Sequence, residues 1–164
     1  MEALRHFDAT ATIQTSPGTL FAHLDDPQRL GAHMSQSSWM MLGSTMTYQF
    51  DEAEGKAVGA HIRMEGRVLG LALDLDEIVT VREIAERKVW KTVGTPHLVI
   101  ISDYEMGFEI TPLVTGSQLR IFINYALPRG PARILGWLLG GMYARWCVTR
   151  MLSDAARHFA GTSS

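Results

Sequence analysis

One carboxylic acid interrupts an otherwise apolar row of alternating residues in the middle of the chain. Glu77 has the same parity as Leu73, Leu75 and Val79. In a regular strand, side chains of equal parity face the same side, which would direct Glu77 toward the interior. A buried carboxyl can orient a ligand hydroxyl, or it can act as an acid or base with a raised pKa. A bulge at Asp76 and Glu77 would instead turn the carboxyl to solvent, and the sequence leaves both alternatives open.

Hydroxyl groups in other alternating segments supply further candidates. Tyr104 is the candidate partner of Glu77 for acid–base catalysis, and Ser102, which has the same parity as Tyr104, offers a second hydroxyl. Tyr48 and Tyr125 each combine an apolar ring with a polar tip, which suits the wall of a ligand site. Each tyrosine fits equally well the role of a core residue with a satisfied hydroxyl.

The remaining candidates are apolar side chains that would line a cavity. Pockets for small molecules are mostly apolar and hold a few polar groups, which is the combination expected here. Plain core packing is the alternative for each residue, and the nine methionines suit either an adaptable cavity or core filling. The candidates from the strands and from a C-terminal helix are Ile62, Met64, Leu73, Leu75, Met106, Phe108, Ile121, Ile123, Leu138, Met142 and Trp146.

Several chemistries are excluded by what the chain lacks. No two of the six histidines have the spacing of metal ligands, so we expect no metal site and no cofactor. Cys147 is the one cysteine, which excludes an internal disulfide and a cysteine-rich zinc site. The glycine-rich phosphate loops and the common hydrolase motifs are missing as well.

The bulk composition narrows the class further. Hydrophobic residues make up 46% of the 164 residues and charged residues 20%, which is typical of a globular domain. The formal net charge of −2 argues against the basic footprint that nucleic-acid binding requires. We expect a single domain over residues 1–160, followed by a loose tail over residues 161–164.

The longest apolar stretch of the chain is too short to span a membrane. Ile134–Tyr143 spans 10 residues, whereas a transmembrane helix needs about 20, and the N-terminus lacks the blocks of a signal peptide. We therefore expect no transmembrane segment and a cytoplasmic location, as a monomer or a homodimer. Weak contact with a membrane surface stays open because this apolar helix start is combined with four arginines. These are Arg133, Arg145, Arg150 and Arg157.

The periodicity predicts an α+β domain with seven antiparallel strands in mostly meander order. The strands are expected at 6–14, 45–50, 60–65, 71–81, 88–93, 98–110 and 119–125. Ser16-Pro17 and Asp26-Pro27 are helix-start signals, and they predict short helices over 19–24 and 28–34. A long helix should begin at Pro131 and end near Phe159. Its expected buried stripe is Trp137, Gly141, Ala144, Val148, Met151, Ala155 and Phe159.

This order of elements resembles the START-like and birch-pollen-allergen superfamily (SRPBCC), in particular its polyketide cyclase/dehydrase-like branch. The resemblance covers nearly the whole chain. It implies a helix-grip fold, in which a curved sheet wraps the C-terminal helix and leaves a cavity between them. The residues that carry it are Ala11-Thr12-Ile13, Ser16-Pro17, Asp26-Pro27, Gly55, Gly59, Glu77-Ile78-Val79, Ile123-Asn124-Tyr125-Ala126-Leu127-Pro128 and the helix through Met151.

Three functional hypotheses follow. The first is a binder or carrier of a hydrophobic small molecule, such as a lipid, isoprenoid or polyketide-like compound. The second is a cyclase or dehydratase that uses Glu77 and Tyr104 as its acid–base pair. The third is a protein-interaction module that uses the apolar helix start. We favour binding, because apolar positions are plentiful and candidate catalytic groups are scarce; the first two hypotheses differ in whether a titratable group faces the cavity.

Overall fold

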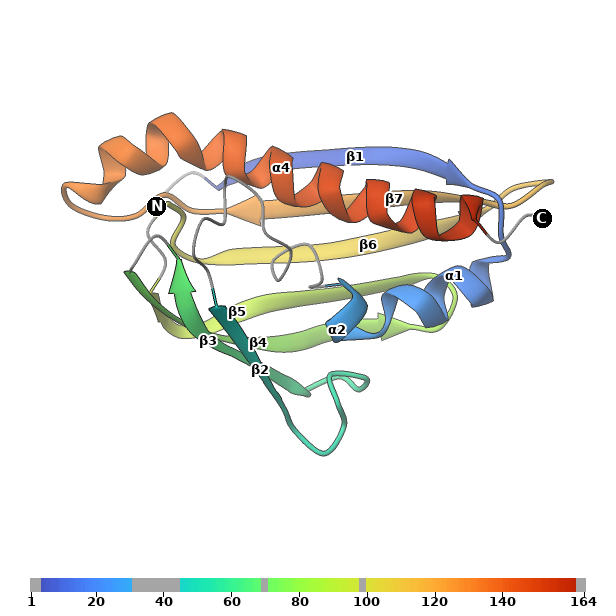
Figure 1. Ribbon diagram of the computed structural model, residues 1–164, viewed down its shortest axis with the longest axis horizontal. Helices are drawn as coiled ribbons and strands as arrows, with labels where there is room; N and C mark the ends of the chain where they lie inside the picture. Colours follow the sequence, from blue (N-terminus) through green and yellow to red (C-terminus); the bar gives the residue numbers. More distant parts are fainter. Residues whose placement is uncertain (1–3, 31–44, 69–70, 98–99, 162–164) are drawn as a thin grey trace.

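Seven strands pair in antiparallel fashion into one sheet, in the order β1-β7-β6-β5-β4-β3-β2 (Figure 1). The computed structural model describes residues 4–30, 45–68, 71–97 and 100–161. The strands are β1 (Arg5–Ile13), β2 (Thr45–Phe50), β3 (His61–Val68), β4 (Leu71–Glu83), β5 (Arg87–His97), β6 (Tyr104–Pro112) and β7 (Ser117–Tyr125). The helices are α1 (Pro17–Leu24), α2 (Pro27–Leu30) and α4 (Ala132–Ala160). The predicted α+β architecture is confirmed.

β1 and β2 form the two edges of the sheet, although they are consecutive among the described strands. β1 pairs with β7, whereas β2 pairs with β3 at the far edge, because the chain leaves the sheet after β1 to form α1 and α2. α4 lies across one face of the sheet and contacts β1 and β7 (Figure 1). This arrangement gives the sheet one face covered by helices and one outer face.

The alternation predicted for β1 and β7 is confirmed. Phe7, Ala9 and Ala11 are half-buried on one side of β1. In β7 the same side is fully buried and belongs to the main core beneath the second half of α4. The buried residues of β7 on that side are Leu119, Ile121, Ile123 and Tyr125.

Both predicted helix starts are present. The Ser16 hydroxyl accepts a hydrogen bond from the Thr19 amide at 3.3 Å, and Pro17 begins α1. The Asp26 carboxylate accepts from the Gln28 amide at 3.0 Å as α2 begins. The second predicted helix extends to residue 34, and its residues 31–34 lie outside the described part.

Two strand predictions need correction. β5 was expected to end before Gly94-Thr95-Pro96, but it continues to His97 because Gly94, at φ +75°, absorbs a register shift against β4. The strand expected from Leu98 begins instead at Tyr104. Ser102 and Asp103 do not pair with β5, because their backbone groups bond Ala126 after β7, at 3.0 and 2.8 Å.

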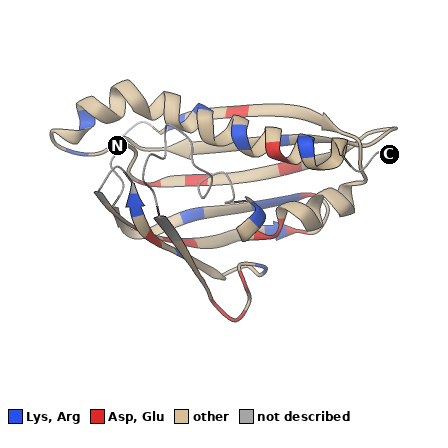
Figure 2. Ribbon diagram, in the orientation of Figure 1, with Lys and Arg blue, Asp and Glu red and all other residues tan. Residues whose placement is uncertain are grey.

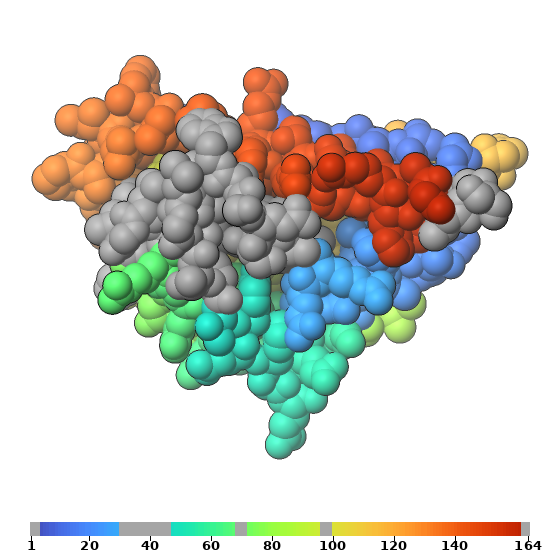
Figure 3. All heavy atoms as spheres, viewed as in Figure 1, coloured from blue at the N-terminus to red at the C-terminus, as the bar shows by residue number. Residues whose placement is uncertain are grey.

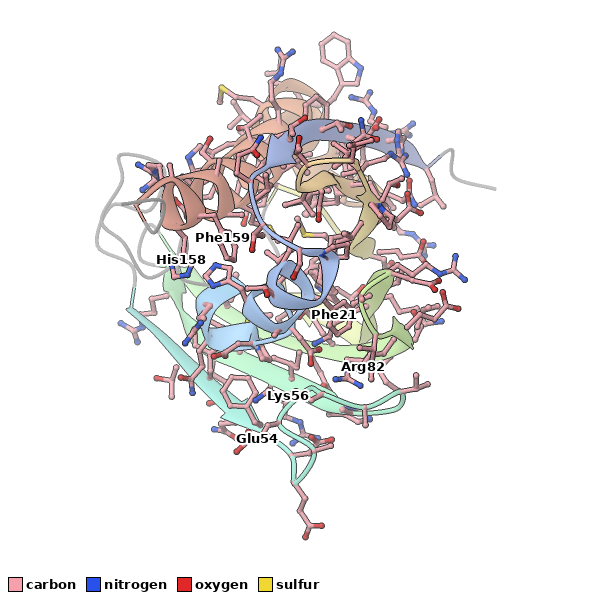
Figure 4. All side chains as sticks on the ribbon, turned by 90° about the vertical axis from the view of Figure 1, so that its right-hand side faces the viewer. Phe21, Glu54, Lys56, Arg82, His158 and Phe159 are labelled. Atoms are coloured by element: carbon pink, nitrogen blue, oxygen red, sulfur yellow. The ribbon has the colours of Figure 1, made fainter. Side chains whose placement is uncertain are left out.

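The end of α4 packs against α1 (Figures 3 and 4). His158 stacks on His23 of α1 with ring centroids 4.0 Å apart, and Phe159 meets the same ring edge-on at 5.2 Å. On the other side of α1, Phe21 contacts Phe108 of the sheet, and the Arg82 guanidinium lies 5.5 Å from the Phe21 ring centroid. α1 and the end of α4 therefore close one end of the core.

A buried ion cluster joins α1 to the sheet. Lys88, only 2% exposed, donates from Nζ to the Asp25 carboxylate at 2.8 Å and to the Asp25 carbonyl at 2.9 Å. Arg82 donates to both carboxylate oxygens, the shortest contact being 2.7 Å. Burial alone would raise the pKa of Asp25, but the hydrogen bonds from Arg82 and Lys88 outweigh it and lower that pKa. This one carboxylate therefore compensates two cations.

The outer face of the sheet carries ion pairs of a different kind. Arg120 of β7 bonds Asp8 of β1 at 2.9 Å and Glu109 of β6 at 2.7 Å. Figure 2 shows acidic residues along both neighbouring strands. All three side chains are more than a third exposed, so water screens this network.

The two halves of α4 are buried in different ways. In the second half the predicted stripe is confirmed, since Ala144, Val148, Met151, Ala155 and Phe159 are all buried. In the first half the prediction is wrong: Trp137 is 63% exposed and Gly141 is exposed too. The buried positions there are Gly136 and Gly140. They share one side of the helix, and a Cβ on Gly136 would lie 2.7 Å from the Ile100 carbonyl oxygen and 2.5 Å from Pro128 Cδ.

Replacing Asp25 by alanine should destabilise the fold far more than the same change at Asp8. Asp25→Ala leaves the buried Lys88 ammonium without its carboxylate, which should lower the free energy of unfolding by about 3 kcal/mol or more. Asp8→Ala breaks an exposed pair and should cost less than about 1 kcal/mol. Urea denaturation at pH 7 measures both values, and equal losses would contradict the structural role of the buried cluster.

Alanine at two glycines in the first half of α4, Gly136 and Gly141, should have opposite effects. Gly136→Ala places a methyl group against backbone and proline ring, so it should lower the free energy of unfolding by about 1–3 kcal/mol. At Gly141 the nearest atom to an added Cβ is the Tyr125 hydroxyl at 3.6 Å. Gly141→Ala should therefore stabilise by up to about 1 kcal/mol through helix propensity alone. Thermal unfolding of both variants checks the sign of each change.

Candidate functional site

The Glu77 carboxyl faces the interior. It is only 5% exposed, and it shares the buried side of β4 with Leu73, Leu75 and Val79. The pairing of β4 with β3 runs without irregularity from His61↔Ile78 to Val68↔Leu71. The register shifts of β4 against β5 lie on either side of Glu77, between Asp74 and Asp76 and between Val79 and Val81. The bulge that would have turned Glu77 to solvent is therefore absent at this position.

Two neighbouring strands supply hydrogen bonds to this carboxyl. The Tyr104 hydroxyl at the start of β6 donates to Glu77 Oε1, and the Trp90 side chain of β5 bonds Glu77 as well. Tyr104 is itself held by Thr92, whose hydroxyl accepts from the Tyr104 amide at 3.1 Å. Regular pairing of β5 with β6 ends at Lys91↔Glu105, so this side-chain bond takes over at the point where the strands diverge.

Burial raises the pKa of Glu77 to about 7. The hydrogen bonds from Tyr104 and Trp90 favour the carboxylate and work in the opposite direction, but they do not cancel the desolvation. A carboxyl with this pKa is present both as acid and as carboxylate near neutral pH. Glu77 can therefore donate or accept a proton at the same position.

The surrounding hydroxyl and thiol groups stay protonated. Burial, followed by the charge of Glu77, raises the pKa of Tyr48 to about 12, and burial raises the pKa of Tyr104 and Tyr143 well above the usual value. Burial also raises the pKa of Cys147 to about 12. Cys147 is therefore a thiol at neutral pH, which argues against a role as a nucleophile. Glu77 is the one group of this set that titrates near neutrality.

The structure brings one subset of the predicted site residues together around Glu77. Met64, Leu73 and Leu75 form a buried apolar cluster, against which Tyr48 and Tyr104 pack. Ile62 belongs to a neighbouring small cluster with Val79. The other predicted strand residues lie in the main core together with the second half of α4. These are Met106, Phe108, Ile121, Ile123 and Tyr125.

Three predicted site residues face elsewhere and need correction. Leu138 and Met142 are 61% and 44% exposed, because α4 turns its glycines rather than its large side chains toward the protein. The Ser102 hydroxyl donates to the Leu127 carbonyl at 3.2 Å and so joins two loops. Trp146 is half-buried, packs against the main core and lies 6.0 Å from Tyr143 between ring centroids.

Two residues near the carboxyl escaped the sequence analysis. Trp90 lies in a segment that was predicted as a strand, but it shares parity with the polar Lys88 and Thr92, so nothing in the sequence indicated that this side is buried. Tyr143 lies one helical turn before Cys147, which it contacts by a side-chain hydrogen bond. The C-terminal helix was predicted, but the stripe that its apolar periodicity predicted to be buried does not include Tyr143.

The comparisons with known proteins locate this fold among solved structures, while no family model matches the chain. Norcoclaurine synthase from Thalictrum flavum superposes with a TM-score of 0.67 at 9% identity, covering 100% of this chain and 99% of that one. The Panax ginseng major latex-like protein 151 gives 0.56 at 16% identity over 95% and 97% of the two chains. Ara h 8.0201 gives 0.56 at 12% identity over 92% and 99%. The chain has the helix-grip fold.

These three neighbours belong to the START-like and birch-pollen-allergen superfamily, so the fold that the order of elements implied is confirmed. At identities of 16% or less, the likeness extends to the fold alone. Among the residues that the structure describes, no helix is both long and apolar enough to cross a bilayer.

The stability of the protein should depend on pH through Glu77. Because its pKa in the folded state is about 7, above the ordinary value of 4.5, the folded state holds this proton more tightly than the unfolded chain. The free energy of unfolding should therefore fall as pH rises from about 4.5 to about 7, by roughly 3 kcal/mol relative to Glu77→Gln. Urea denaturation of both proteins across this range measures the difference.

Two further variants test the assignment of this titration. Tyr104→Phe removes a hydrogen bond that favours the carboxylate, so the transition should move to higher pH. Glu109→Gln changes a carboxyl on the outer face and should leave the wild-type pH profile in place. Parallel profiles for wild type and Glu77→Gln would show that Glu77 does not titrate as described.

Proposed function

We propose that this protein binds a hydrophobic small molecule that carries a polar group, in a cavity between the inner face of the sheet and α4. Glu77 and Tyr104 would hold the polar group, and Met64, Leu73 and Leu75 would contact the apolar part. The observation that carries the proposal is the hydrogen-bonded pair of Glu77 and Tyr104, buried beside an apolar cluster.

The chemistry of the pair supports a ligand with a hydroxyl or a carbonyl group. Burying a carboxyl costs free energy that an apolar side chain at the same place would not cost. As a carboxylate, Glu77 accepts a hydrogen bond from a ligand hydroxyl; as an acid, it donates one to a carbonyl. Lipids, isoprenoids and polyketide-like compounds combine such a group with an apolar body, and they are the compound classes we propose.

A solved neighbour offers parallel support. Thalictrum flavum norcoclaurine synthase has been crystallised in complex with dopamine and hydroxybenzaldehyde, and that structure has a TM-score of 0.65 to this chain. Both molecules are aromatic and carry hydroxyl groups. The same fold thus binds small molecules that combine an apolar ring with hydroxyl groups in that protein, at 12% sequence identity to this chain.

Acid–base catalysis of the cyclase or dehydratase kind is the second candidate, and the pKa of Glu77 near 7 favours it. A carboxylate with that pKa can remove a proton from the carbon beside a ligand carbonyl, and the electron pair then moves onto the carbonyl oxygen as an enolate. Tyr104 remains protonated, because burial raises its pKa, and can hydrogen-bond that oxygen. The enolate carbon would close the ring on a second carbonyl of the same chain, whose oxygen takes the electron pair of the broken C=O π bond and then the proton held by Glu77.

Native mass spectrometry of the freshly purified protein tests the binding proposal. We expect an apolar compound of roughly a few hundred daltons to remain bound and to be released by denaturing extraction, which identifies its class. A clean apo mass, together with no thermal shift from a panel of lipids, isoprenoids and polyketides, would overturn the proposal and favour a filled interior.

Glu77→Gln separates the two candidate functions once a ligand is known. Glutamine keeps hydrogen-bonding atoms at the same place, so a carrier should change its affinity by less than about tenfold. An enzyme should lose turnover by about 10²- to 10⁴-fold, because the amide cannot take up the proton. Glu109→Gln, on the outer face, is the matched control and should change neither quantity.

A further inference from the structure

The outward side of α4 is apolar over its first three turns. Ile134 is 71% exposed, and the neighbouring large side chains are exposed as well. The set comprises Ile134, Leu135, Trp137, Leu138 and Met142 and is called here the apolar face of α4. A helix on the surface of a globular protein normally shows charged and polar residues to water, so the usual polarity is inverted.

The glycines explain how this inversion arises. Gly136 and Gly140 are the buried residues in this part of α4, and they bring its backbone against Pro128 and the Ile100 carbonyl. With small residues turned to the protein, the large apolar side chains of the same turns must face outward. The apolar face therefore follows from the packing of the helix, and rotating α4 to bury it would place Trp137 or Leu138 where only glycine fits.

The segment of the chain that contains this face carries charges of one sign. From residue 110 to residue 153 the chain contains no aspartate or glutamate, whereas it contains five arginines. Arg129, Arg133 and Arg145 are exposed and lie before and after the apolar face. In Figure 2 the first half of α4 carries basic but no acidic residues, and in Figure 3 it protrudes at one end of the molecule.

We propose that the protein docks on anionic phospholipid membranes through the apolar face of α4. The helix would lie in the plane of the interface, with its aliphatic side chains and the Trp137 indole inserted among the headgroups and upper acyl chains. The flanking arginines would contact the anionic headgroups. This goes beyond ligand binding, since it gives the protein a surface from which a hydrophobic ligand is taken up or delivered.

Charge complementarity favours a membrane over a second copy of the chain. Two copies that met through this face would bring Arg133 and Arg145 of one copy toward the same residues of the other, and the segment from residue 110 to residue 153 has no acidic residue. Like charges across an interface oppose association. An anionic bilayer supplies both an apolar phase and the negative charges.

Cosedimentation with lipid vesicles tests the proposal. The wild-type protein should pellet with vesicles of phosphatidylcholine containing about a third phosphatidylserine, and more weakly with pure phosphatidylcholine or at high salt. Trp137→Gln combined with Leu138→Gln should lower the partition coefficient at least about tenfold. Arg133→Gln should weaken binding about fivefold, and on the anionic vesicles only.

The matched control removes two exposed apolar residues from the other end of the molecule. Leu113 and fully exposed Val114 lie in the turn between β6 and β7, far from the start of α4 in Figure 1. Leu113→Gln combined with Val114→Gln should leave vesicle binding within about twofold of wild type. Wild-type protein that stays in the supernatant with both vesicle compositions would overturn the proposal, and so would an equal loss in the control. A dimer detected by light scattering and abolished by the Trp137 and Leu138 changes, without vesicle binding, would assign the face to a second copy.

Discussion

Burial of the Glu77 carboxyl sets the main constraint on this structure. An ionisable group on the apolar side of a sheet is tolerated only where hydrogen bonds partly offset its desolvation. Those bonds come from Tyr104 and Trp90, on β6 and β5, so three strands must keep their observed register for the site to exist. A shift of β4 by one residue would exchange Glu77 for Asp76, which lies on the outer face next to His61.

β4 and β5 also contribute to a second buried carboxyl, Asp25, which is stabilised in its charged form. Beyond the register shift between Val79 and Val81, Arg82 turns inward and meets Lys88 of β5 at the Asp25 carboxylate. There the ionised form of the acid accepts hydrogen bonds from two cations, whereas the hydrogen bonds to Glu77 come from the neutral side chains of Tyr104 and Trp90. The structure thus contains one carboxyl that is held in its charged form and one that is present in both forms near neutral pH, and the charge of their hydrogen-bond donors distinguishes them.

The pattern of side chains along the sequence predicted the features of the fold that side chains determine, namely which face of a strand is buried and where the short helices start. The parity of Leu73, Leu75 and Val79 made Glu77 a candidate for the interior but left a bulge as the alternative, whereas the serine–proline and aspartate–proline pairs marked the starts of α1 and α2. The failures occur where the backbone decides. The close approach of Gly136 to the Ile100 carbonyl rotates α4, the left-handed Gly94 prolongs β5, and the bonds of Ser102 and Asp103 to Ala126 delay β6. None of these contacts leaves a hydrophobic pattern in the sequence.

The division of α4 into two halves also distributes local stability unevenly. Val148, Met151 and Phe159 tie the second half to the main core, so its amide hydrogens exchange with solvent only when the whole domain opens. The first half buries two glycines, and apart from the half-buried Leu139 and Tyr143 its large apolar side chains are exposed, so fewer apolar contacts are broken when its turns fray. The molecule therefore has a helix that can open at one end while the sheet stays folded. Such an opening gives access to the interior at a small fraction of the free energy of global unfolding.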